Sequence, residues 1–214
     1  KGIVKPVIPI DRIFIEDPVR MIRAVKYGAT TGCKLSHKLK KKIRISAPLL
    51  SPVSPSRLTE EFLKIINGGH SFEIVNAALE TDLYEYLQPA ASNLILENKK
   101  FAKSYHENLK KLDDFVKQNQ DSRLGERLYF LLKDFVEQLT DWKLEIQSEY
   151  SSSEIYKKTW AICRNFVLPI NPQRTELDFA VRKLLQDAGI QVKPKRAKRN
   201  RKLHIQQDVS EQEN

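Results

Sequence analysis

The sequence predicts an all-α protein, and three observations support that fold class. Glycine is scarce, at seven of 214 residues, and apolar and polar residues alternate little after residue 16. Apolar residues instead recur every three or four positions along most of the chain, as they do on the buried face of a helix. Hydrophobic residues make up 41% of the sequence. A chain of this length and composition can bury a core without disulfides or structural metals.

The first strongly marked helix is expected between Pro18 and Gly32. Asp17 is expected to cap it, because a carboxylate at this position can accept hydrogen bonds from free backbone N–H groups. Pro18 suits the first turn of a helix, and Gly32 suits the left-handed backbone that often follows the last turn. The residues that flank this segment therefore predict both of its ends.

Two more helices are expected before Pro89. Ser54 precedes a proline and is expected to cap a helix that ends at the glycine pair of residues 68–69. Ser71 is expected to open the next helix, which carries apolar residues at helical spacing as far as Leu83. Together with the first helix, these segments form one predicted helical unit.

The rest of the chain continues the helical pattern. One long helix is expected over residues 92–118, and others over residues 125–142 and 153–167. Asn171 is expected to cap a last helix that ends at Gly189. The helix expected over residues 153–167 has a stripe that is rich in aromatic residues, and core packing is its main interpretation. The residues of this stripe are Tyr156, Trp160, Cys163 and Val167.

The net charge of +10 is concentrated in two short stretches. Residues 34–44 hold six Lys or Arg and residues 193–202 hold seven, with no acidic residue in either stretch. Focused positive charge is typical of a surface that binds a polyanion, most often nucleic acid. For the first stretch, a solvated lysine-rich helix face is an equal alternative. Residues 193–214 have few apolar side chains, so a disordered basic tail is expected there. The residues expected to contact RNA in this tail are Lys193, Lys195, Arg196, Lys198, Arg199, Arg201 and Lys202.

Several classes of protein are not indicated by the sequence. No apolar run approaches the roughly 18 residues of a membrane span, so no membrane partner is expected. Cys33 and Cys163 are too isolated for a zinc site, no disulfide partner is expected, and a reducing cytoplasm suits them. The four histidines show no metal-ligand spacing, and no phosphate-binding loop occurs. No catalytic residue and no metal ligand is therefore predicted in these 214 residues.

Arg20 is unusual for its place in the first helix. A capping box would have Glu or Gln at this position, and an arginine there faces the positive end of the helix dipole, at a cost of about 0.3–1 kcal/mol. A local ion pair with Glu16 or Asp17 is one explanation. The other is that a carboxylate and a guanidinium are held side by side, where an acceptor and a planar fork of donors can read the edge of a nucleobase.

The segment EDPVRMIRAVKYGATTG, residues 16–32, resembles the neck motif of the class II nucleotidyltransferases, the family of bacterial poly(A) polymerases and CCA-adding enzymes. Residues 168–185 resemble, more loosely, a late body helix of poly(A) polymerases. A second family motif, Ser-x-x-Arg-x-x-x-Glu, is matched by Ser54, Arg57 and Glu61. The residues that match the neck motif are Glu16, Asp17, Arg20, Arg23, Ala24, Lys26 and Tyr27.

The resemblance implies a nucleotide-binding site in the neck. Asp17 and Arg20 are expected to face the base of ATP, and Glu16 and Arg23 to support them. The second motif is expected to brace the site from the next helix, as an ion pair between residues 57 and 61, one turn apart. The alternative for that pair is an ordinary ion pair on a helix surface.

The resemblance also implies a domain organisation. Residues 1–15 would be a linker from an amino-terminal catalytic head, residues 16–89 the neck, residues 90–192 an RNA-binding body and residues 193–214 the tail. Mg²⁺ is expected only in the head, because its Gly-Ser and Asp-x-Asp motifs do not occur in this sequence. This chain alone is therefore expected to be inactive. The full-length protein is expected to be a poly(A) polymerase that adds AMP from ATP to RNA 3′ ends.

Three alternatives stay open on the sequence. A CCA-adding tRNA nucleotidyltransferase shares the neck motif and uses CTP as well as ATP. A helical RNA-binding or regulatory protein without catalysis would keep the basic stretches. A generic helical scaffold with a basic tail would respond to neither ATP nor RNA.

Overall fold

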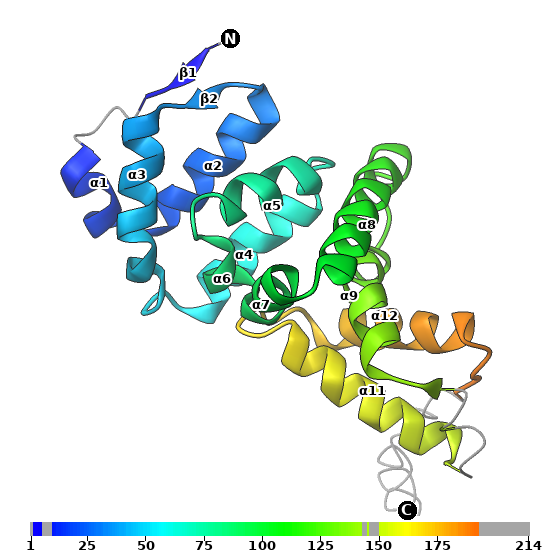
Figure 1. Ribbon diagram of the computed structural model, residues 1–214. Helices are drawn as coiled ribbons and strands as arrows, with labels where there is room; N and C mark the ends of the chain where they lie inside the picture. Colours follow the sequence, from blue (N-terminus) through cyan, green and yellow to red (C-terminus); the bar gives the residue numbers. More distant parts are fainter. Residues whose placement is uncertain (1, 6–9, 143–144, 146–149, 193–214) are drawn as a thin grey trace, which may run out of the picture.

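The computed structural model describes residues 2–5, 10–142, 145 and 150–192, and it confirms the all-α prediction (Figure 1). Helices α1 to α3 lie at one end of the molecule and α11 and α12 at the other. The strands in the described residues are β1 (Ile3–Val4) and β2 (Lys34–Leu35), which pair in parallel. In this part of the chain, no helix has the length and apolar composition that a membrane span requires.

The amino-terminal unit begins with a helix that the sequence did not predict. Helix α1 (Ile10–Glu16) forms within the segment expected to be a linker, and Phe14 places its ring in the core. Helix α2 (Val19–Thr31) ends at Gly32, whose φ of 66° confirms the predicted left-handed position. The next elements are α3 (His37–Ser46), η1 (Ala47–Leu50), α4 (Pro55–Ile66), α5 (Ser71–Leu79), α6 (Tyr84–Leu87) and α7 (Pro89–Glu97).

Two expected helices are each divided by a local backbone feature. The helix that opens at Ser71 stops before Asp82, whose φ of 56° cannot continue a right-handed helix. The helix predicted over residues 92–118 breaks at Asn98, which has extended backbone. The side chain of Asn98 accepts hydrogen bonds from the backbone N–H groups of Lys100 and Phe101, both at 3.0 Å, and so caps a new helix.

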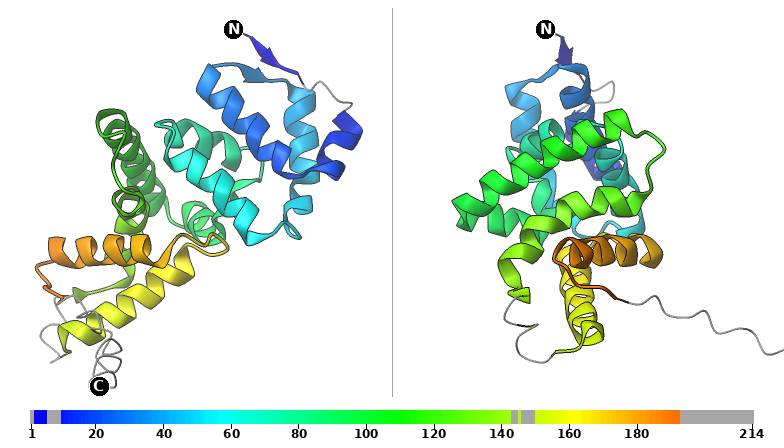
Figure 2. Two further views of the ribbon diagram at one scale, coloured as in Figure 1. Left: turned by 180° about the vertical axis from the view of Figure 1, so that it is seen from behind. Right: turned by 90° about the vertical axis from the view of Figure 1, so that its right-hand side faces the viewer.

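The carboxy-terminal unit comprises α8 (Lys99–Gln118), α9 (Leu124–Leu139), α11 (Ser152–Phe166) and α12 (Arg174–Asp187). Helix α9 packs against both α8 and α12, and α11 packs against α12 (Figure 2). The prediction that Asn171 caps the last helix is wrong, because Gln173 is the residue before α12. The Asn171 side chain instead accepts a hydrogen bond from Arg164 at 3.1 Å.

The two units share a continuous apolar core and are joined by buried hydrogen bonds. Asp113 of α8, which is 4% exposed, accepts from the backbone N–H groups of Ser71 at 2.6 Å and Phe72 at 2.9 Å. A carboxylate from 42 residues further along the chain thus caps α5. The backbone N–H of Asn171 donates to Thr59 of α4 at 2.9 Å. These contacts hold α4 and α5, and hence the site described below, against the carboxy-terminal helices.

Candidate nucleotide-recognition and RNA-binding site

The Asp17 carboxylate binds arginines and does not cap a helix. Pro18 is the residue before α2 and the helix has no side-chain cap, so the predicted capping role of Asp17 is wrong. Its Oδ1 accepts a hydrogen bond from Nη2 of Arg57 at 2.8 Å. Its Oδ2 lies 3.6 Å from Nε of Arg20 and 3.9 Å from Nη1 of Arg23. Charged guanidinium groups are stronger partners for a carboxylate than backbone N–H groups are, which accounts for this arrangement.

Arg20 lies in the first turn of α2, as the sequence predicted, and its side chain is 37% exposed. The separation of 3.6 Å from Asp17 is an ion pair without a hydrogen bond. Within the described residues, the Arg20 guanidinium makes no hydrogen bond. The ion pair anticipated from the sequence therefore forms, and the N–H groups of the Arg20 guanidinium remain available to a ligand.

Glu61 of α4 is the buried anion of the site, with 1% of its side chain exposed. It accepts hydrogen bonds from Arg23 at 2.9 Å, Lys26 at 3.2 Å and Lys64 at 3.0 Å. Burial by itself would raise the pKa of Glu61, but the three hydrogen bonds outweigh burial and hold the pKa below its ordinary value. Glu61 is therefore a stable anion that fastens α2 to α4.

The predicted ion pair between Arg57 and Glu61 is wrong. Although the two residues are one turn apart on α4, Arg57 pairs with Asp17 and Glu61 pairs with cations of α2 and with Lys64. Arg57 reaches Asp17, which lies just before α2, and Glu61 reaches cations of α2 itself. The second family motif thus contributes one cation and one anion, each to a different partner.

Glu16 is not brought into this network. It is the last residue of α1 and is exposed, and it makes no contact with Asp17, Arg20 or Arg23 among the described interactions. The arginine that does support Asp17 from another helix is Arg57. The resemblance had assigned Arg57 to this site, but with Glu61 as its partner. The packing of α2 against α4 brings it to Asp17 instead.

A small cavity lies beside the network, with a volume of about 320 Å³. Arg20 and Arg23 form its polar side, and Tyr27, which is 60% exposed, lies at its rim. Phe14 of the unpredicted helix α1 contributes to its apolar wall. An open arginine fork, a carboxylate oxygen and an apolar wall next to one another are the elements that hold a planar heteroaromatic ring.

In the first basic stretch, residues 34–44, some cations have acidic partners and others are exposed without an ion pair among the described residues. Lys40 binds Glu80 at 2.7 Å and Arg44 binds Asp82 at 3.2 Å, so these two residues of α3 already have anionic partners. Lys38 and Lys41 are exposed, and neither makes an ion pair within the described part of the chain. The open positive charge on α3 is therefore smaller than the sequence suggests and lies on its outer face.

The second basic stretch, with the RNA contacts predicted at residues 193–202, lies outside the described residues. In the described ranges no group of three His, Cys, Asp or Glu side chains could hold a metal ion. Both Cys33 and Cys163 are free thiols.

Part of the sequence matches known proteins. Residues 32–95 match the family described as "Probable RNA and SrmB- binding site of polymerase A". The poly(A) polymerase I of Escherichia coli O157:H7 is 37% identical over 83 residues, which are 39% of this chain and 18% of that protein. The poly(A) polymerase I of Salmonella typhi is 33% identical over 98 residues, which are 46% of this chain and 21% of that protein.

A second kind of enzyme is similar to the same extent. The CCA-adding enzyme of Geobacillus thermodenitrificans is 37% identical over 87 residues, which are 41% of this chain and 22% of that enzyme. The matched region thus spans about a fifth of the length of these curated relatives. Over this region, the chain is similar to poly(A) polymerases and CCA-adding enzymes.

Proposed function

We propose that this chain supplies base recognition and RNA binding to a polynucleotide adenylyltransferase, which adds AMP from ATP to RNA 3′ ends. One observation supports the proposal above the others. Asp17 and Arg20 form an ion pair and Arg20 lines a cavity, so an acceptor oxygen and unbonded guanidinium donors lie next to one another beside that cavity. The similarity of residues 32–95 to poly(A) polymerases agrees with this role.

The pair suits the adenine edge because adenine carries an amino group, a donor, beside a ring nitrogen, an acceptor. Asp17 would accept from the amino group, and Arg20 would donate to the ring nitrogen. Arg57 fixes the Asp17 carboxylate by the hydrogen bond to Oδ1. Oδ2 has ion pairs with Arg20 and Arg23 but no hydrogen bond from a described residue, so it is the oxygen that would accept from the base. The bond-making step is attack of the RNA 3′-hydroxyl on the α-phosphate of ATP with loss of pyrophosphate, and the described residues take no covalent part in it.

RNA binding would use the outer face of α3. Lys38 and Lys41 are exposed cations within the matched region, and residues 193–202 add seven more basic residues by sequence. Lysine contacts to phosphate are independent of base sequence and weaken as salt rises. Such contacts suit an enzyme that accepts many different 3′ ends.

The test uses the natural polypeptide that contains these residues, incubated with a short RNA and one nucleoside triphosphate at a time. Incorporation of many AMP residues, with little CMP, GMP or UMP, is the expected result. RNA binding without incorporation of any nucleotide would overturn the proposal and favour a non-catalytic RNA-binding protein.

A CCA-adding tRNA nucleotidyltransferase is the second candidate, because a CCA-adding enzyme is as similar to this chain as the poly(A) polymerases are. Cytosine also carries an amino group beside a ring nitrogen, so Asp17 and Arg20 could read CTP in the same way. A tRNA that lacks its terminal CCA separates the two candidates. Addition of two C and one A, followed by a stop, would identify the CCA-adding activity.

A further inference from the structure

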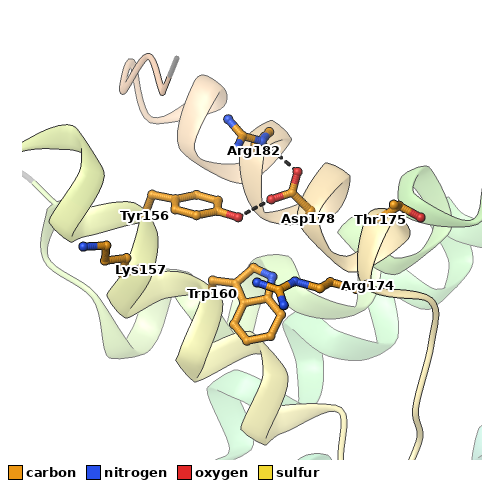
Figure 3. A pocket seen from close by; sticks show the side chains of 7 residues that line it. All are labelled: Tyr156, Lys157, Trp160, Arg174, Thr175, Asp178 and Arg182. Atoms are coloured by element: carbon orange, nitrogen blue, oxygen red, sulfur yellow. Dashed lines mark hydrogen bonds and ion pairs between the residues drawn. The ribbon is translucent and has the colours of Figure 1, made fainter. Parts of the chain in front are cut away.

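A second cleft lies between α11 and α12, at the opposite end of the molecule from α2 (Figure 1). Its volume is about 440 Å³, within the range of small-ligand pockets. Figure 3 shows aromatic rings from α11 facing arginines from α12 across this cleft. It shares no residue with the neck site and lies beyond residues 32–95. Its lining includes Tyr156, Trp160, Arg174, Thr175, Asp178 and Arg182.

One side of the cleft is fixed by internal contacts. Asp178 accepts hydrogen bonds from the Tyr156 hydroxyl and from Nε of Arg182, the latter at 2.8 Å. The Arg182 guanidinium also lies 4.8 Å from the centre of the Tyr156 ring. The carboxylate of Asp178 is thus neutralised within the cleft wall. It adds little repulsion toward an anionic ligand.

Arg174 on the other side is open to a ligand. It is exposed, and its guanidinium lies 5.2 Å from the centre of the Trp160 ring. Within the described residues it makes no hydrogen bond and no ion pair. As the first residue of α12 it faces the positive end of the helix dipole. A cation held in this unfavourable place only by an aromatic ring is poised to bind an anion.

The aromatic side of the cleft has an unsatisfied donor. The Trp160 indole N–H is buried and has no hydrogen-bond partner among the described residues. A buried donor without a partner is rare in folded proteins, and a ligand acceptor can satisfy it. Because the exposed Arg174 side chain covers the ring, movement of that side chain would open the face and the N–H of Trp160 together (Figure 3).

The first turn of α12 adds two backbone donors. The N–H groups of Arg174 and Thr175 have no partner in the described part of the chain, and both residues line the cleft. Free N–H groups at the start of a helix favour a phosphate oxygen. Cation, N–H groups and an aromatic ring are therefore next to one another, which is the combination that a nucleotide needs.

The cleft is also next to the start of the second basic stretch. Nη1 of Arg182 donates to the backbone carbonyl of Val192 at 3.1 Å, and Lys193 follows Val192 directly in the chain. A long polyanion in contact with the basic stretch would therefore pass close to the cleft. This continuity favours a polynucleotide over a free mononucleotide or an acidic peptide.

We propose that this cleft binds one nucleotide of a single-stranded RNA, with its base on Trp160 and its phosphate at Arg174 and the first turn of α12. The proposal rests on the RNA-binding part of the proposed function and adds the place and mode of contact. Stacking on an aromatic side chain tolerates any base, as a polymerase with many RNA substrates requires.

The test measures tryptophan fluorescence during titration with an oligoadenylate of about 12 nucleotides, a length within the range of known single-strand sites. The protein has two tryptophans, so the full chain with Trp142→Phe reports on Trp160 alone. Quenching of Trp160 by the RNA is expected. Trp160→Leu should weaken RNA binding by about fivefold or more, the lower end of the range for one stacked base.

Arg174→Ala keeps the test meaningful if Trp160→Leu disturbs folding, because Arg174 is exposed and makes no hydrogen bond or ion pair with other described residues. It should reduce the slope of log affinity against log salt by about 0.7, the value for one phosphate contact to a single strand. The matched control is Lys103→Ala, which removes one exposed charge from α8 and should not change Trp160 quenching.

The outcomes separate this proposal from the proposed function. Normal RNA affinity with no response from Trp160, or equal salt slopes for Arg174→Ala and wild type, would overturn the cleft assignment and leave RNA binding intact. Quenching by AMP or by oligoglutamate as strong as by RNA would overturn it in favour of a mononucleotide or a general anion site. A wild-type chain that binds no RNA would overturn both proposals.

Discussion

Asp17 and Arg57, 40 residues apart in the sequence, are joined by a hydrogen bond of 2.8 Å between Oδ1 and Nη2. This bond ties the segment between α1 and α2 to the first turns of α4, and it orients the carboxylate next to Arg20. The two conspicuous motifs of the sequence, one around residue 17 and the other around residue 57, are thereby two parts of one site.

Removal of this bond should lower nucleotide selectivity more than stability. For Arg57→Ala, and for Asp17→Asn, kcat/KM for ATP in the natural polypeptide should fall by about tenfold or more, the effect of one hydrogen bond to a charged group. The expected measurement is the ratio of kcat/KM for ATP to that for UTP, whose base has a carbonyl in place of the amino group that Asp17 would bind. A ratio unchanged in both variants would exclude Asp17 from base recognition.

Arg20→Ala should leave the fold intact and weaken the use of ATP. The ion pair with Asp17 is partly exposed and lacks a hydrogen bond, so the free energy of unfolding should fall by less than about 1 kcal/mol. Thermal unfolding measures the stability, and single-turnover incorporation of AMP measures the function. Unchanged kinetics in a normally folded variant would contradict the base-reading role of Arg20.

Glu61→Gln should destabilise the neck and change how stability depends on pH. The three hydrogen bonds hold the folded-state pKa of Glu61 below its ordinary value of 4.5. The stabilisation is therefore present above that value and is lost as pH falls through the folded-state pKa. At pH 7 the variant should lose about 1.5–3 kcal/mol in the free energy of unfolding.

The same variant should show a weaker loss of stability below pH 4.5 than wild type does. Denaturant unfolding at several pH values measures both effects. Parallel curves for wild type and Glu61→Gln across this range would show that the carboxylate is not the group that is linked to acid unfolding.

The two faces of α3 should differ in RNA binding. The double variant Lys38→Ala with Lys41→Ala removes open cations and should reduce the salt slope by about 1.4 for a single strand. Lys40→Ala with Arg44→Ala removes the same charge from residues already paired with acids, and should change the slope little. Equal slopes for the two double variants would favour the solvated-face interpretation of this stretch.

Deletion of residues 193–214 should lower RNA affinity and flatten its dependence on salt. The deleted segment carries seven Lys or Arg between residues 193 and 202. If all seven contact phosphate, the slope of log affinity against log salt concentration should fall by about 5 for a single strand. Filter binding of an oligonucleotide at four salt concentrations measures it. Identical slopes with and without the segment would contradict its role as an RNA contact.

The sequence predicted the fold class and the approximate positions of most helices, because helical periodicity and glycine or proline boundaries are local signals. It missed the break at Asn98, because a side chain that caps a helix can also lie inside a longer apolar pattern without altering it. It also missed helix α1, which is short and gains stability by packing Phe14 into the core.

The resemblance to a known family singled out residues that the structure joins in one network of ion pairs, but it gave some of them wrong partners. Residue spacing suggested that Asp17 caps α2 and that Arg57 pairs with Glu61. The structure instead joins Asp17 to Arg57, and Glu61 to Arg23. Sequence spacing describes neighbours on one helix, whereas a carboxylate binds the cations that lie closest to it in space.

The sequence by itself therefore determined that the chain is helical, that its positive charge lies in two stretches and that residues 16–32 resemble a nucleotidyltransferase motif. Only the tertiary structure decided which of the α3 cations are open, which arginine orients Asp17, and that Trp160 and Arg174 face each other across a cleft. Charge and periodicity follow directly from the order of residues in the chain. Burial, ion pairs and clefts arise only when helices that are distant in the sequence pack together.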